Sequence, residues 1–384
     1  MPLPDRPSLP FLKKLAKDRL PDLRRRDPAA RLADAQRLVA REHGFPSWRA
    51  LRAEVDRRLA APSPDRASRL FAAIAAGEGD LTDRLLAEDP ALANARDEEG
   101  QTPLLAAVDA HRAALIPILL RRGADPHAVY AHSAHTPLSW AVTILALDCA
   151  RALVAGGVEP DLYSAAGMGD VARVRAFFGP DGRLRPRASV TGSSRYAADG
   201  SRLPCPPERE AEIVADALYV AARAGQAAAV RELLAHGPDL SFRAFAGATV
   251  LHWAYFGGSR EVVALLQAAG ADPTLRDPVL GCTPVAFGIC FPASVAWVSK
   301  VRQRLAEDPR LVGAESARGG PLHEAAHAGA LDAVKALLEA GADPARRNAE
   351  GGTALDLARA RPDQAGCVKV AEWLTSSAPE SSRG

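Results

Sequence analysis

Apolar residues recur along the chain in short stripes with the spacing of one helix face. The run 262–266 (VVALL) is such a stripe, because residues three and four positions apart lie on the same side of a helix. Gly270 follows it, and glycine commonly ends a helix in the left-handed conformation. Similar runs at 171–178 and 218–234 predict further helices. The pattern therefore indicates a chain built from many short helices.

Two sequence motifs recur with constant spacing. Thr-Pro-Leu occurs at 102–104 and again at 136–138, 34 residues later. Gly-Ala-Asp-Pro lies 21 residues after the residue that opens its unit, at 123–126, 270–273 and 341–344. Because one helix pair cannot bury its own apolar faces, successive pairs must stack on one another. Two motifs that keep one phase predict a helical-repeat solenoid.

This pattern resembles the ankyrin repeat, in which TPLHxAAxxG precedes a Val/Leu-rich helix and a GAD turn. The agreement is strongest at 321–329 (PLHEAAHAG), which 333–338 (AVKALL) and 341–343 (GAD) follow. It covers roughly residues 68–375, about four fifths of the chain. The resemblance implies an all-α ankyrin solenoid of about eight repeats that binds another macromolecule, most often a protein, without catalysis.

The remaining segments complete the predicted organisation. We predict a basic helical leader at 1–62, repeats one to four at 68–178, an insertion at 179–207, repeats five to eight with a C-terminal cap at 208–375, and a disordered tail at 376–384. The insertion is rich in Pro, Gly, Ser and Arg and has no helical period. It is either a mobile surface loop or a clamp that meets acidic or phosphorylated groups. The arginines of such a clamp are Arg183, Arg185, Arg187 and Arg195.

The leader contains a run, 35–48 (AQRLVAREHGFPSW), that resembles a segment preceding ankyrin arrays in many bacterial proteins. Its pattern predicts helices at 32–42 and 48–59, with Ser47 as the cap of the second. The end of a solenoid has to be shielded from water. We therefore expect the leader to cap the first repeat, with Phe45 and Trp48 as buried contacts.

Charge is uneven along a chain whose net charge is only +2. Residues 1–60 hold 15 Lys/Arg and 8 Asp/Glu, so the rest of the chain is net negative. The basic runs within 13–26 offer contacts for nucleic acid. Asp18, Asp22 and Asp27 interleave with them, which favours an ordinary solvated helix face.

Several features bear on the compartment. The five cysteines are scattered and include no CxxC pair, which is typical of free thiols in a reducing compartment. The first residues lack the apolar stretch of a signal peptide. A run of 22 uncharged residues between Asp277 and Lys300 contains prolines and glycines that should break a spanning helix. We therefore expect a cytoplasmic protein without membrane contact.

Histidine motifs suggest metal chemistry at first sight. The segment 323–327 (HEAAH) matches the HExxH pattern of zinc proteases. The ankyrin pattern already accounts for His323, as the histidine that bonds neighbouring backbone, and His252 has the same phase. A third ligand is not indicated, and no nucleophile–base motif occurs. We expect no metal, no cofactor and no catalytic residue.

The resemblance places partner contacts on finger tips and first helices, which line a groove in ankyrin proteins. The residues at these positions are Phe245, Phe256, Val279, Leu280, Phe291, Arg223, His132, His135 and His327. The five apolar ones either form a binding patch or pack on one another or on the insertion. Two alternatives to protein binding stay open. One is a hydrolase-like enzyme in the groove or insertion, and the other is a nucleic-acid-associated regulator acting through residues 13–26.

Overall fold

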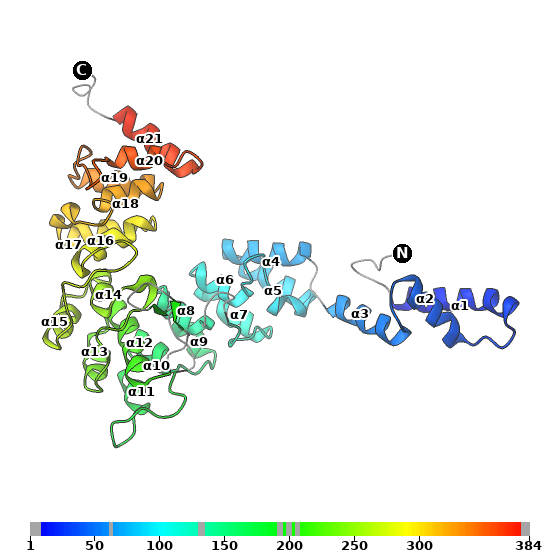
Figure 1. The fold of residues 1–384 in the computed structure, drawn as a ribbon. Coiled ribbons are helices and arrows are strands. Elements are labelled where there is room, and N and C mark those ends of the chain that lie inside the picture. Colours follow the sequence, from blue (N-terminus) through cyan, green and yellow to red (C-terminus); the bar gives the residue numbers. More distant parts are fainter. Residues whose placement is uncertain are drawn as a thin grey trace. The chain divides into compact units, whose positions relative to one another are not determined.

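The computed structural model describes residues 9–60, 64–129, 135–189, 195–196, 202–203 and 208–377 (Figure 1). Contacts between residues divide the chain into two compact units, Met1–Asp125 and Pro126–Gly384. Within the described ranges both units are helical, and the second also contains a pair of two-residue strands.

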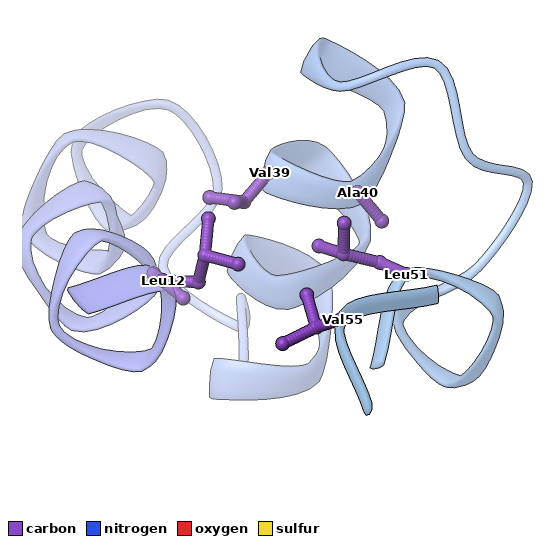
Figure 2. Close-up of a cluster of buried hydrophobic side chains, with 6 residues drawn as sticks. Leu12, Val39, Ala40, Leu51 and Val55 are labelled. Carbon is purple, nitrogen blue, oxygen red and sulfur yellow. The ribbon is translucent and has the colours of Figure 1, made fainter. Parts of the chain in front are cut away.

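The first unit begins with three helices that share one apolar core. They are α1 (Leu9–Arg26), α2 (Leu32–Glu42) and α3 (Trp48–Ala60). Their buried side chains point toward one another (Figure 2), and are Leu12, Ala16, Val39, Ala40, Leu51 and Val55. The Oγ of Ser47 accepts a hydrogen bond from the Ala50 amide at 3.1 Å, so the predicted cap of α3 is confirmed.

Phe45 and Trp48 differ from the sequence expectation. Both are only half-buried, and they pack on the core of the leader itself. Three short helices enclose little apolar volume, so they use these rings for their own core. That the leader caps the first repeat stays a prediction.

Two helix pairs follow in the first unit and form repeats one and two. Repeat one consists of α4 (Pro64–Ala76) and α5 (Gly79–Glu88), and repeat two of α6 (Pro103–Asp109) and α7 (Ile116–Arg121). Short 3-10 turns, η1 (Pro90–Asn94) and η2 (Ala113–Leu115), accompany them. α4 packs on α6 and α5 packs on α7, so the repeats stack helix by helix.

The second unit continues the same stacking through seven further pairs of described helices. The pairs are α8 (Pro137–Thr143) with α9 (Leu147–Ala155), α10 (Leu162–Met168) with α11 (Val171–Ala176), α12 (Glu210–Arg223) with α13 (Ala227–Leu234), α14 (Val250–Gly257) with α15 (Arg260–Ala268), α16 (Pro284–Ser294) with α17 (Val298–Glu307), α18 (Pro321–His327) with α19 (Leu331–Glu339), and α20 (Ala354–Arg359) with α21 (Ala365–Ser377). Each first helix packs on the next first helix, from α8 to α20. The predicted all-α repeat solenoid is confirmed.

Local chemistry explains where the helices begin and end. The Oγ1 of Thr136 accepts a hydrogen bond from the Ser139 amide, and Pro137 occupies the first turn of α8. Both features favour a helix start. Gly270 after α15 and Gly341 after α19 have φ of +94° and +91°, a conformation that glycine adopts at little cost.

The insertion is partly docked on the repeats. The Leu162 amide donates to the Ala188 carbonyl at 2.7 Å, and Nδ1 of His236 lies 3.2 Å from the Gly182 carbonyl oxygen. The described part of the insertion at 179–189 therefore contacts the repeats on both sides of it. Further on, β1 (Arg195–Tyr196) pairs antiparallel with β2 (Arg202–Leu203), and β1 contacts the 3-10 turn η3 (Phe245–Gly247).

The arginines of the insertion are partly engaged within the chain. The Nε of Arg183 lies 3.9 Å from a Glu210 carboxylate oxygen, and Arg185 Nε donates to the Phe178 carbonyl at 3.5 Å. Arg187 is exposed, and the side chain of Arg195 lies outside the described residues. That these arginines form a clamp for acidic or phosphorylated groups stays a prediction.

The uncharged run 278–299 contains fewer helix breaks than predicted. α16 continues through Gly288 and Pro292 to Ser294, and residues 278–283 form the turn before it. A Cβ on Gly288 would lie 3.0 Å from the Tyr255 carbonyl oxygen, so glycine permits the close approach of α14 and α16. Within the parts of the chain that the structure describes, no helix combines the length and apolar character that a membrane crossing requires.

Candidate protein-binding surface

The apolar residues expected on the partner surface divide into buried and exposed side chains. Phe256, Leu280 and Phe291 are buried, contrary to the sequence expectation, because large side chains at this register fill the space between neighbouring repeats. Phe245 is 45% exposed and Val279 is 55% exposed. These two side chains are the part of the expected patch that faces solvent.

The buried rings form an aromatic cluster, defined as Tyr219, Trp253, Phe256, Phe287 and Phe291 from α12, α14 and α16. Trp253 is central, with ring centroids 5.3 Å from Phe256, 5.1 Å from Phe287, 5.0 Å from Phe291 and 5.5 Å from Tyr219. Its ring planes meet those neighbours at steep angles, an arrangement that aromatic pairs favour. The cluster locks repeats five to seven together.

The two exposed apolar side chains lie at finger tips of repeats six and seven. The Phe245 ring is 6.2 Å from both Trp253 and Phe291, so its inner side rests on the aromatic cluster. The carboxylate of Asp277 accepts hydrogen bonds from the amides of Val279 and Leu280, at 2.9 and 2.7 Å. This carboxylate holds the turn that presents Val279.

Arg223 is a buried cation stacked on the aromatic cluster. It is 7% exposed, and its Cζ lies 4.4 Å from the Trp253 ring centroid and 4.8 Å from that of Phe256. A guanidinium over an aromatic face is stabilised electrostatically. The sequence placed Arg223 on the binding surface, whereas the structure buries it, and both Arg223 and Phe245 contact Trp253.

Three buried polar atoms in this region have no hydrogen-bond partner among the described residues. They are Tyr219 Oη, Arg223 Nε and Trp253 Nε1. Burial raises the pKa of Tyr219, while the charge of Arg223 opposes that shift. Nearly all buried polar groups in folded proteins are paired, and an unpaired one costs about 1–3 kcal/mol. Three such atoms around one ring system therefore need an explanation.

Lys300 was not foreseen as part of this surface. Its Nζ lies 5.1 Å from the Phe256 ring centroid and donates to the Gly257 carbonyl and to Gln303 Oε1, both at 3.1 Å. Burial lowers the pKa of Lys300 to about 8, with a further contribution from Arg304. Only the tertiary packing of α17 on the end of α14 brings this lysine to the cluster.

The three predicted histidines do not join this surface as a group. His132 lies outside the described residues. His135 is buried beside Ser139 Oγ, 3.3 Å from its Nδ1, and burial lowers its pKa to about 4. His327 is half-buried on α18, and burial lowers its pKa, with Arg318 and Arg361 adding to the effect.

The HExxH segment is part of the repeat structure. Glu324 is buried, and its carboxylate accepts hydrogen bonds from Ser316 Oγ at 2.8 Å and Arg318 Nη1 at 2.9 Å. His323 is buried, and hydrogen bonds with the backbone of Gly352 and Arg346 oppose the lowering of its pKa by burial, as expected for the histidine of the ankyrin pattern. Over the described ranges, His, Cys, Asp and Glu side chains form no group of three that could hold a metal ion.

A cleft of about 420 Å³ separates α15 from α17. Arginines line it, but they are paired within the chain. Arg304 contacts Glu307, and Arg310 holds Asp308 through two hydrogen bonds of 2.9 Å. Its charges are therefore largely compensated, unlike that of Arg223.

The basic face of α1 is mixed in charge. Lys13, Lys14 and Lys17 are exposed, but Arg25 pairs with Asp22 and Arg19 lies 3.7 Å from Glu42. This arrangement fits a solvated helix better than a strip of phosphate contacts.

Comparison with known families identifies the repeats. The family model "Ankyrin repeats (3 copies)" matches residues 208–277, and "Ankyrin repeats (many copies)" matches residues 322–376. The first range covers α12 to α15 and the second covers α18 to α21. Residues 208–277 and 322–376 are therefore ankyrin repeats, and ankyrin repeats are protein-binding modules.

Curated relatives share the repeats over part of their length. A putative palmitoyltransferase of Danio rerio is 33% identical over 154 residues, covering 37% of this chain and 22% of that protein. A mitochondrial disaggregase of Bos taurus is 37% identical over 147 residues, covering 37% and 21%. A B-cell lymphoma 3 protein homolog of Mus musculus is 26% identical over 279 residues, covering 72% and 52%. The chain thus spans between a fifth and a half of the length of these relatives.

Proposed function

We propose that this chain is a non-catalytic adaptor that binds a protein partner across repeats five to seven. The contact surface consists of Phe245 and Val279, with the buried Arg223 and the aromatic cluster as its anchor. The observation that supports it is the coincidence of exposed apolar tips with three unpaired buried polar atoms. Exposed apolar groups around a buried aromatic and arginine anchor are typical of interface centres.

Binding without catalysis is the function that the titratable groups favour. An enzyme needs polar groups that converge in a pocket with suitable pKa values. His135 is buried with a pKa of about 4, and Glu324 is held by Ser316 and Arg318. Two relatives have names of enzymes, but this chain covers only 22% and 21% of those proteins, so their activities do not transfer.

Two further parts of the proposal concern the cellular compartment and the N-terminal leader. The cysteines at 149, 282, 290 and 367 are free and buried, which is typical of a reducing compartment, and we place the chain in the cytoplasm. The leader at 1–62 shields an end of the array, as in the bacterial ankyrin-repeat proteins that the segment resembles.

The test is selection of short random peptides displayed against the full chain, followed by binding measurements with variants. We expect Phe245→Asp and Val279→Asp to weaken the selected peptides at least about tenfold, since each removes an apolar contact and adds an unpaired charge. The control is Val368→Asp on α21, where Val368 is 37% exposed. Equal loss with the control, or no loss with either tip variant, would place the contact elsewhere.

A further inference from the structure

Two buried cations lie against one ring of the aromatic cluster without a carboxylate. Arg223 and Lys300 are 7% and 8% exposed, and both lie about 5 Å from the Phe256 centroid. Within the described residues, neither forms an ion pair, and Lys300 is bonded to a carbonyl and an amide oxygen instead. Glu307, the carboxylate that acts on Lys300, is paired with Arg304.

A buried charge without a carboxylate at the position of Lys300 is unusual within the array. Lys300 is the third residue of α17, and the equivalent residue of repeat four is Arg173, whose side chain is 33% exposed and pairs with Glu159. In repeats three, five, six and eight the third residue of the second helix is small or apolar. Those residues are Cys149, Ala229, Val262 and Ala333, and all four are buried. A charge at a core position costs stability, so packing alone does not account for a lysine here.

Arg223 likewise differs from the surface arginines of neighbouring repeats. Arg231 pairs with Glu261, and Arg302 pairs with Glu339. Stacking on Trp253 and Phe256 holds the face of the Arg223 guanidinium, but stacking does not satisfy its edge, and Nε stays unpaired. A fork of guanidinium N–H groups matches the two oxygens of a carboxylate.

We propose that the protein partner docks through an acidic side chain whose carboxylate accepts hydrogen bonds from Arg223, close to the positive charge of Lys300. This inference rests on the proposed function, because it names the chemistry of the segment that the surface binds. Apolar residues beside the acidic one contact Phe245 and Val279. One carboxylate would account for the unpaired Nε of Arg223 and for the buried charge of Lys300.

The surroundings favour an acidic protein segment over the phosphates of a nucleic acid. Nucleic-acid sites use many exposed cations that follow the phosphate backbone. Here the two cations are buried, and the exposed side chain that contacts the same aromatic cluster is the apolar Phe245. A single negative side chain flanked by apolar groups fits this pattern.

The test is a double-mutant cycle between the chain and a selected peptide. Peptides chosen from the random display are synthesised with each Asp or Glu, in turn, changed to its amide. We expect one such change to weaken binding to the wild type at least about tenfold, and to have no further effect on Arg223→Met, which keeps the side-chain stem. Arg223→Lys should recover only part of the binding, because it keeps the charge but loses the fork.

Each outcome decides between the two proposals. If selected peptides contain no required acidic residue, or if the acidic residue matters equally in Arg223→Met, the inference is wrong. In that case, sensitivity to Phe245→Asp still supports the proposed function. A wild-type chain that selects no peptide, or one that binds a random DNA duplex more tightly than any peptide, contradicts both. Since Arg223→Met could disturb packing, Lys300→Met provides a second variant, which should also weaken the acidic peptide more than its amide form.

Discussion

Repeats six and eight open with the same Leu-His pair, but their histidines have different surroundings. In repeat six, Nδ1 of His252 lies 2.7 Å from Thr249 Oγ1, and Nε2 lies 3.1 Å from the Cys282 carbonyl oxygen. In repeat eight, Gly320 replaces the threonine, so His323 has no threonine hydroxyl beside it, and its hydrogen bonds are with the backbone of Gly352 and Arg346. The motif determines where the histidine is buried, whereas its neighbours determine which groups it bonds.

The same two repeats differ in what their first helices carry. Repeat six continues into Trp253 and Phe256, which belong to the aromatic cluster. Repeat eight continues into Glu324, which is bonded to Ser316 and Arg318, and ends at the half-buried His327. The first helix of the repeat thus carries part of an aromatic core in repeat six and a polar hydrogen-bond network in repeat eight. Four predictions separate these roles, from the largest effect to the smallest.

The largest difference is expected at the position that Phe256 and His327 share. Phe256→Glu removes a fully buried ring and buries a charge, so the free energy of unfolding should fall by about 4 kcal/mol or more. His327→Glu should change it by less than about 1 kcal/mol, because this side chain is half-buried beside Arg318 and Arg361. Urea unfolding measures both. Similar losses would mean that the two repeats have equivalent cores.

The two histidines should differ in the stability that they provide. His252→Ala leaves Thr249 Oγ1 and the Cys282 carbonyl without a partner and opens a cavity, for a loss of about 3 kcal/mol. His323→Ala should cost less, about 1–2 kcal/mol, because it loses backbone hydrogen bonds but leaves no threonine hydroxyl without a partner. Thermal and urea unfolding of both variants check the order. A larger loss for His323→Ala would contradict the difference in bonding.

Acid should destabilise the protein partly through His252. Burial lowers the pKa of His252 to about 4 from an ordinary value of 6.5. Between these values the unfolded chain binds more protons than the folded chain, so stability should fall as pH falls from 6.5 to 4, and this contribution levels off below that. The effect is on the order of 3 kcal/mol. In His252→Gln the dependence of urea midpoint on pH should be flatter, and an unchanged profile would exclude this source.

The smallest effect is expected at Lys300, where repeat eight has Ala333. Lys300→Met removes a buried charge and keeps the stem, so stability at neutral pH should change by less than about 1 kcal/mol. The pKa of Lys300 is lowered to about 8 from 10.5. Wild-type stability should therefore gain a contribution as pH rises above 8, because the unfolded chain keeps its proton. That contribution should be missing in the variant, and equal slopes would show that Lys300 is not buried as a cation.

Much of the candidate surface followed from repeat register. Register places residues at finger tips and on first helices, and it correctly located Phe245 and Val279 on the exposed side. It could not separate them from Phe256 and Phe291, because burial at these positions depends on how closely the next repeat approaches. The sequence did not indicate a role for Lys300, because the residues of the preceding repeat that it contacts, Phe256 and Gly257, are distant from it in the chain.

The sequence by itself determined the helical repeats. Periodic apolar stripes, Thr-Pro helix starts and glycine ends are local features, because each depends only on residues that lie close together in the sequence. Only the tertiary structure decided which rings interlock, which polar atoms stay unpaired and which cations lack a carboxylate. These outcomes depend on distances between side chains of different repeats, such as Arg223, Phe256 and Lys300, which stacking alone brings together.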